Sequence, residues 1–179
     1  MSRIIRLVSQ VDNTSIQTDI QSAKGSKLLL NLIEEYEEDV FVIPEIKGEI
    51  LKAIVEYLER IKDHPYSEIT KPLSNFDFKE LLSEWEYNFL QRFEDFHNLF
   101  ALINGANYLD IKGLFEICCA KAASMIKDLD NESFMEVFQI EPDMIEEDHK
   151  NIINQYEILK YQDDNDKNPR GDKELGLNK

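Results

Sequence analysis

Residues 105–115 read Gly-Ala-Asn-Tyr-Leu-Asp-Ile-Lys-Gly-Leu-Phe and are predicted to join two helices. Asp95 can cap the first helix, which keeps an apolar face at helical spacing as far as about Tyr108. Asp110 can cap the second helix. Asn107 and Tyr108 then lie where one helix ends and the next begins, a junction that can expose an aromatic ring to a partner. From the residues alone, a core position is favoured for this tyrosine.

The N-terminal part of the chain predicts a small three-stranded sheet. Apolar and polar side chains alternate in residues 4–9 and again after the turn signal at residues 12–13, which indicates a β-hairpin. Residues 40–43, Val-Phe-Val-Ile, form a third strand that ends at a proline. Asp19 can cap a first short helix between the hairpin and this strand. The acidic residues 34–39 are interpreted as a solvated loop rather than a cation site.

Helices are predicted for most of the remaining chain. Residues 46–62 carry apolar side chains at three- and four-residue spacing, which is typical of an amphipathic helix. Residues 63–77 are polar and predict an internal loop. Residues 78–93 carry a second helical stripe. Strands with short helices between them, followed by helices alone, indicate an α+β fold with a small sheet and a helical layer.

Two short helices are predicted near the C-terminus. Asp130 can cap the first, and a capping-box pattern at Asp143 can begin the second. We therefore expect a domain over residues 1–127, appended helices over 128–160, and a disordered polar tail over 161–179.

The composition is that of a globular protein, with 42% apolar and 31% charged residues. Lys and Arg number 20 against 36 Asp and Glu, a net charge of −16 that argues against binding nucleic acid or an anionic membrane. No apolar run approaches the length of about 18 residues that spans a bilayer. Cys118 and Cys119 are neighbours and are interpreted as reduced thiols, so a cytoplasmic and nuclear location is expected.

The sequence offers no recognisable catalytic or metal-binding motif. His64, His97 and His149 lie far apart, and the glycines form no phosphate-binding loop. We expect no catalytic residue, no cofactor and no metal. Cys118 can be read as a nucleophile, but a small buried core residue is the favoured interpretation.

Several segments together resemble the Skp family, the S-phase-kinase-associated adaptors of SCF ubiquitin ligases, of which elongin C is a shorter relative. The most specific is Ala-Asn-Tyr-Leu-Asp-Ile-Lys-Gly-Leu at residues 106–114, which is similar to the family signature. The other matching segments, in chain order, are residues 5–9, 42–46, 50–51, 84–90, 99–100, 125–127, 138–140 and 154–156. The resemblance covers about residues 3–160.

The resemblance implies a BTB/POZ fold, with a three-stranded sheet flanked by helices, followed by C-terminal F-box-binding helices. It implies a non-enzymatic bridge that holds the N-terminal repeat of a cullin scaffold with one surface and F-box proteins with another. Asn107 and Tyr108 are the implied cullin contacts. The implied F-box contacts are Met125, Ile126, Phe134, Phe138, Ile140 and Tyr156. A homodimer is expected when no F-box protein is bound.

The chain departs from the family pattern near its C-terminus. Tyr156 stands where the family usually has Trp, and Ile145 stands near the usual Thr. Glu146 occupies the position of a proline that is hydroxylated in some members, so that modification should be absent. These departures are consistent with weaker or more specialised F-box pairing.

Two other classes of function stay open at this point. The chain can be a self-associating BTB-type structural protein without a ligase role, or a small acidic enzyme with no recognisable motif. Co-purification distinguishes an adaptor, which recovers a cullin and several F-box proteins, from a self-associating protein, which recovers itself.

Overall fold

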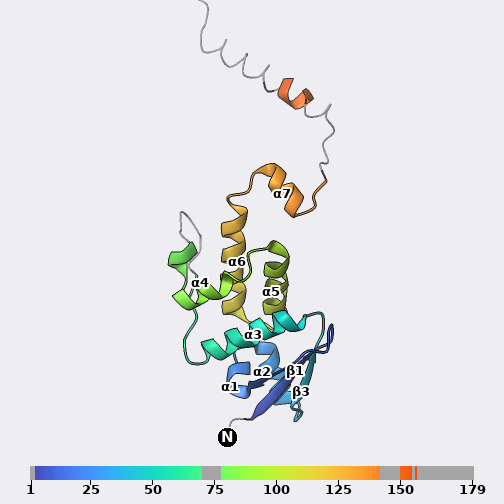
Figure 1. The fold of residues 1–179 in the computed structure, drawn as a ribbon, viewed down its shortest axis with the longest axis vertical. Coiled ribbons are helices and arrows are strands. Elements are labelled where there is room, and N and C mark those ends of the chain that lie inside the picture. Colours follow the sequence, from blue (N-terminus) through green and yellow to red (C-terminus); the bar gives the residue numbers. More distant parts are fainter. Residues whose placement is uncertain (1–2, 70–77, 142–149, 155, 157–179) are drawn as a thin grey trace, which may run out of the picture. The chain divides into compact units, whose positions relative to one another are not determined.

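The computed structural model describes residues 3–69, 78–141, 150–154 and 156 (Figure 1). The chain divides into two compact units, Met1–Asp130 and Asn131–Lys179, here called the N-terminal and C-terminal units. The division after Asp130 and the expected boundary after residue 127 fall in the same short connection between two helices. The two units are described separately.

The sheet of the N-terminal unit has the strand order β2-β1-β3. β1 (Ile4–Ser9) pairs antiparallel with β2 (Ser15–Asp19) in a hairpin and parallel with β3 (Val40–Ile43). Ile5, Leu7 and Ser9 are buried, while the side chains between them face outward. The predicted hairpin and third strand are confirmed.

Short helices connect the hairpin to β3. α1 (Ile20–Ala23) is capped by the Asp19 carboxylate, as predicted, which accepts hydrogen bonds from the N–H groups of Gln21 and Ser22. α2 (Lys27–Glu35) is capped by the Ser26 hydroxyl. Because β3 pairs parallel with β1 on the edge opposite to β2, a connection of this kind is needed to carry the chain from one edge of the sheet to the other.

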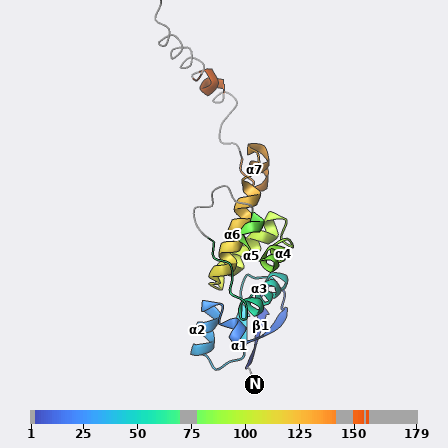
Figure 2. The ribbon, with the colours of Figure 1, turned by 90° about the vertical axis from the view of Figure 1, so that its left-hand side faces the viewer.

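α3 (Gly48–Ile61) is the central helix of the N-terminal unit. It contacts β1, β2 and α1 on one side and α5 (Phe96–Tyr108) on the other, and both views show it between the sheet and the helical layer (Figures 1 and 2). Its fully buried side chains include Leu51, Ile54 and Leu58. The core therefore extends through α3 from the sheet to the helices above it.

The helical layer contains α4 (Glu84–Leu90), α5 and α6 (Lys112–Ile126), with α5 and α6 packed against each other. Asp95 caps α5 through a 2.8 Å hydrogen bond from the Asn98 N–H, which confirms the predicted cap. Cys118 is buried in the core, and burial raises the pKa of its thiol well above the usual range. The interpretation of Cys118 as a core residue is confirmed.

The prediction of a single helix over residues 78–93 is wrong, because the helical conformation is interrupted before Ser83. A 3₁₀ turn, η1 (Phe78–Leu81), precedes the break, and α4 follows it with a capping box between Ser83 and Glu86. The buried Glu86 carboxylate also accepts hydrogen bonds from the N–H and hydroxyl of Ser67. These local hydrogen bonds end one element and begin another where apolar periodicity alone suggests continuity.

Asp110 was predicted to cap the second junction helix, and this is also wrong. The cap position of α6 is Ile111, with no side-chain cap hydrogen bond. Asp110 adopts a left-handed backbone with φ of 49°, which ends α5, and its carboxylate forms a 3.3 Å ion pair with Lys27. The carboxylate is therefore directed to α2 rather than to the first N–H groups of α6.

The C-terminal unit contains α7 (Asn131–Val137) and a helical turn over residues 150–154. No residue of α7 is buried. Gln139 adopts a left-handed backbone with φ of 52° just after the helix. The predicted capping box at Asp143 and the tail over residues 161–179 lie outside the described residues, as do Ile145 and Glu146.

Candidate functional site

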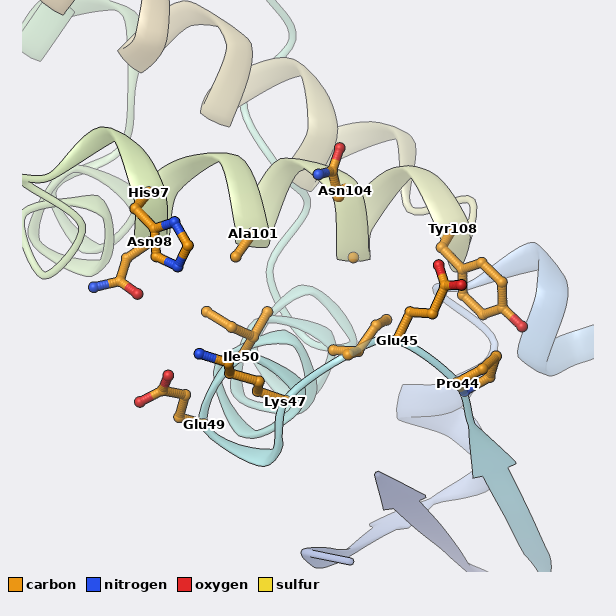
Figure 3. A pocket seen from close by; sticks show the side chains of 12 residues that line it. Pro44, Glu45, Lys47, Glu49, Ile50, His97, Asn98, Ala101, Asn104 and Tyr108 are labelled. Carbon is orange, nitrogen blue, oxygen red and sulfur yellow. The ribbon is translucent and has the colours of Figure 1, made fainter. Parts of the chain in front are cut away.

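A groove of about 320 Å³ lies between the β3–α3 connection and one face of α5 in the N-terminal unit (Figure 3). The connection supplies one wall, α5 supplies the other, and Ile50 of α3 lies between them. The lining residues are Pro44, Glu45, Ile46, Lys47, Glu49, Ile50, His97, Asn98, Ala101, Asn104, Gly105 and Tyr108. The groove therefore combines an apolar floor with polar and charged side chains at its margins.

Gly105 sets how closely α5 approaches α3. A Cβ atom at this position would lie 2.7 Å from Cδ1 of Ile54 and 3.5 Å from side-chain atoms of Ile46 and Ile50. The missing side chain lets the two helices meet and leaves the backbone of α5 in the wall of the groove.

The β3–α3 connection is a tight turn held by hydrogen bonds within the turn and from the sheet. The Ile46 N–H donates to the Pro44 carbonyl at 2.7 Å, and Glu45 between them has a φ of 59°. The Ser9 hydroxyl, buried in the sheet, donates to the Ile46 carbonyl at 2.7 Å. The main chain of this wall is therefore held by the sheet, while the Glu45 side chain is exposed.

Asp12 fixes the start of α3, next to this connection. Its carboxylate accepts hydrogen bonds from the Gly48 N–H at 2.9 Å and from the Thr14 N–H at 3.0 Å. These hydrogen bonds, that from Gly48 foremost, lower the pKa of Asp12 to about 2. Lys47, the cap residue of α3, offers no side-chain cap, so Asp12 supplies one from the hairpin turn.

One end of the groove is formed by the junction after α5. Asn107 and Tyr108 are both exposed, with Tyr108 showing 46% of its surface, so the core position favoured from the residues alone is wrong. The buried Ser26 hydroxyl donates to the Leu109 carbonyl, and the Lys27 N–H donates to the Asp110 carbonyl at 3.3 Å. The start of α2 thus anchors the backbone that presents Tyr108.

The residues predicted as F-box contacts are divided between the two units. Met125 and Ile126 are half-buried at the end of α6, and Met125 packs against the core. In the C-terminal unit, the rings of Phe134 and Phe138 lie 4.5 Å apart, centre to centre. Two further predicted contacts are exposed in that unit, Ile140 and Tyr156.

A shallow groove of about 540 Å³ lies beside α7 within the C-terminal unit. Its lining residues are Glu132, Met135, Glu136, Gln139, Ile140 and Glu141. Ile140 is the one predicted contact among them. The lining therefore combines two apolar side chains, Met135 and Ile140, with three carboxylates.

The sequence identified Tyr108 but not the rest of the groove around it. Glu45, Ile50 and Gly105 come from separate segments that the tertiary fold brings together. The signature motif covers Tyr108, and the Val-Ile-Pro-Glu-Ile segment covers Pro44 to Ile46, so part of each wall falls in a segment that resembles the family. No local pattern shows that the two segments face each other.

Among the residues that the structure describes, no group of three His, Cys, Asp or Glu side chains is arranged to hold a metal ion. Within the same residues, no helix combines the length and apolarity needed to cross a membrane.

Comparison with known proteins gives two family matches. The dimerisation domain of the Skp1 family matches residues 112–157, and the tetramerisation domain of that family, a POZ domain, matches residues 3–63. The second match agrees with the expected BTB/POZ fold, since it covers the sheet, α1, α2 and α3.

The chain is also similar along most of its length to curated proteins. It is 38% identical over 149 residues to the S-phase kinase-associated protein 1 homolog of Tetrahymena thermophila, covering 83% of this chain and 89% of the relative. It is 32% identical over 143 residues to the E3 ubiquitin ligase complex SCF subunit sconC of Aspergillus terreus, covering 79% and 87%. The corresponding protein of Talaromyces marneffei is 32% identical, with coverage of 79% and 88%. The chain belongs to the Skp1 family.

Proposed function

We propose that this protein is the non-enzymatic adaptor subunit of an SCF-type cullin–RING ubiquitin ligase. It bridges the N-terminal region of a cullin to F-box substrate receptors, and thereby serves ubiquitin-dependent protein degradation. Support comes from the relatives named as SCF subunits, which align with 79% of this chain, and from the Skp1 family domains at both ends of the described fold. The bond-forming chemistry of the ligase then belongs to other subunits.

The single observation that carries the proposal is the exposed Tyr108 at one end of the groove between the β3–α3 connection and α5. An exposed tyrosine beside an apolar floor is the kind of residue that dominates protein–protein contacts. Ser26 and Lys27 of the α2 start hold the adjacent backbone in place, so the ring is presented from a rigid junction. We assign this groove and Asn107 to the cullin.

The second partner surface is assigned to the end of α6 and to the C-terminal unit. α7 buries none of its residues, yet it carries Phe134 and Met135, and Phe138 follows it. Short helices of this kind gain most of their stability from packing, so a partner helix laid along α7 would stabilise it. We assign Met125, Ile126, Phe134, Phe138, Ile140 and Tyr156 to F-box proteins.

We further propose that the adaptor works in the cytoplasm and nucleus, where reduced cysteines persist. In the absence of an F-box protein, its F-box-binding surface can pair two copies.

Affinity purification of the tagged full-length protein from its own cells tests the proposal. The expected recovery is one cullin together with several different F-box proteins. Recovery of this chain alone, as a homo-oligomer, would instead support the self-associating BTB-type protein. Recovery of neither a cullin nor an F-box protein would overturn the adaptor role.

A further inference from the structure

Glu45 has an unusual conformation for a residue with a long side chain. It is the central residue of a three-residue turn closed by the 2.7 Å hydrogen bond from the Ile46 N–H to the Pro44 carbonyl. Its φ of 59° lies in the left-handed region, where glycine and asparagine are far more common. Nothing in the turn itself requires glutamate, since glycine would adopt this backbone with less strain.

The turn directs the Glu45 carboxylate to the end of the groove where Tyr108 lies (Figure 3). Among the residues that the structure describes, this exposed carboxylate has no ion pair and no side-chain hydrogen bond. Lys47 is the basic residue nearest to Glu45 in the sequence, two positions later. Figure 3 shows its amino group directed away from Tyr108, toward the Glu49 end of the groove. Asp110, two residues after Tyr108, is paired with Lys27.

The Tyr108 end of the groove therefore combines three features that suit a long cationic side chain. Pro44 and Ile46, which flank Glu45 in the lining, are apolar and can cover an aliphatic stem. The exposed Tyr108 ring offers its face to a cation, and the Glu45 carboxylate offers a negative charge. The net charge of −16 adds a long-range attraction for a basic partner surface.

We propose that Glu45 is a specificity-determining residue that selects a lysine or arginine side chain of the cullin, held between the Glu45 carboxylate and the Tyr108 ring. This inference rests on the proposed adaptor function and names the chemistry of the contact at the same groove. The left-handed turn places a carboxylate where the partner's cation arrives.

The test measures the affinity of the full-length protein for the N-terminal region of the cullin recovered in the purification, at about 50 and 500 mM salt. At low salt, Glu45→Gln should weaken binding about threefold to fivefold and Glu45→Lys about tenfold or more, as for an exposed charge contact and its reversal. Both losses should shrink at high salt, because exposed charges are then screened. The matched controls Glu34→Gln and Glu34→Lys change an exposed glutamate of α2 and should leave the affinity unchanged.

Glu45→Gly separates a binding role from a structural one. Glycine relieves the left-handed strain, so the melting temperature should rise while the affinity for the cullin falls as it does in Glu45→Gln. A purely structural role would move both quantities in the same direction. The reverse change, Lys or Arg to Glu at each basic position of the cullin fragment in turn, should identify one variant whose binding Glu45→Lys restores.

The outcomes separate this inference from the function on which it rests. If the wild-type protein binds the cullin but the Glu45 variants bind with the same affinity and the same salt dependence, the Glu45 contact is wrong and the adaptor role stands. If the wild-type protein recovers no cullin, the proposed function itself fails.

Discussion

Asp12 shows how one carboxylate can join two elements. It closes the β1–β2 turn through the Thr14 N–H and caps α3 through the Gly48 N–H. Gly48 is close-packed here, because a Cβ atom would lie 2.3 Å from Cβ of Thr14. The turn, the helix start and the groove wall that follows β3 therefore depend on the charge of Asp12.

This charge predicts a pH dependence of stability. The folded protein lowers the pKa of Asp12 from 3.8 to about 2, so its stabilisation is complete above pH 3.8 and is lost as the pH falls through 2. Thermal melts of the wild type and Asp12→Asn should differ most above pH 4 and converge toward pH 2. Asp63→Asn, an exposed control, should differ little from the wild type at any of these pH values. A constant difference across this range would contradict the prediction.

At Asn107 and Tyr108 the prediction concerns binding rather than stability. The double substitution Asn107→Lys with Tyr108→Lys should abolish cullin binding while leaving F-box binding nearly intact. Two unpaired ammonium groups in a desolvated contact should make the free energy of association less favourable by several kcal/mol, on the order of 3–5. Binding is measured by co-purification and by titration with the recovered cullin fragment.

The chain offers a matched control for this double variant. Asn31 and Tyr36 lie on and just after α2, and Tyr36 is 49% exposed, similar to Tyr108. Asn31→Lys with Tyr36→Lys introduces the same charges and should leave both partners bound. Equal cullin recovery by the two folded double variants would show that the Tyr108 junction is not part of the cullin interface.

Among the elements, the approach of α5 to α3 decides whether the groove exists. Gly105→Ala should lower the free energy of unfolding by about 1 kcal/mol, because overpacking of about 1–3 kcal/mol exceeds the gain of about 1 kcal/mol in helix propensity. The obstructing atom is Cδ1 of Ile54, and the other neighbours lie at ordinary contact distance. In an Ile54→Val background, which lacks that atom, Gly105→Ala should instead stabilise the protein. Denaturant unfolding of the four proteins measures this coupling, and additive effects would contradict it.

α6 and α7 should differ in their local stability. α6 buries seven residues, from Gly113 to Ala122, whereas α7 buries none. Amide hydrogen exchange of the isolated protein should therefore be faster throughout α7 than in the middle of α6. An F-box peptide should slow exchange in α7 far more than in β1. Equally slow exchange in both helices without a partner would mean that α7 is no open docking surface.

At the scale of the whole molecule, the division after Asp130 predicts that the two partner surfaces can be separated. A chain ending at Asp130 should keep the melting temperature of the N-terminal unit and its cullin binding, but lose F-box binding. A control chain ending at Tyr161 should keep both partners, since the residues beyond it are predicted to be dispensable. Loss of cullin binding by the shorter chain would show that the cullin site extends into the C-terminal unit.

The fold was predictable from the sequence where the signals are local. The alternation in β1, the Asp19 and Asp95 caps and the apolar stripe of α3 depend on neighbouring residues, and all four are confirmed. The α+β class followed from their order along the chain.

The rest of the structure depends on distant contacts. Asp110 is a residue type that commonly caps helices. Its carboxylate instead forms an ion pair with Lys27, 83 residues earlier in the chain. The groove forms because Gly105 packs against Ile54 and because the Pro44–Ile46 turn and Tyr108 line the same groove. Neither pairing leaves a periodic signal in the sequence. The resemblance implies binding residues such as Tyr108 because it carries information about partners, which propensities do not.

The parallel pairing of β1 with β3 also bears on how the chain folds. β1 and β2 are joined by a short turn, and a hairpin of this kind forms within about 1–10 μs. β3 must close a loop that contains α1 and α2 before it reaches the other edge of β1, so its docking is the slower, non-local event. Until then the second edge of β1 is unpaired, and an unpaired edge can recruit a strand of another chain. Newly synthesised chains are therefore most exposed to misassembly in the interval between hairpin formation and the arrival of residues 40–43.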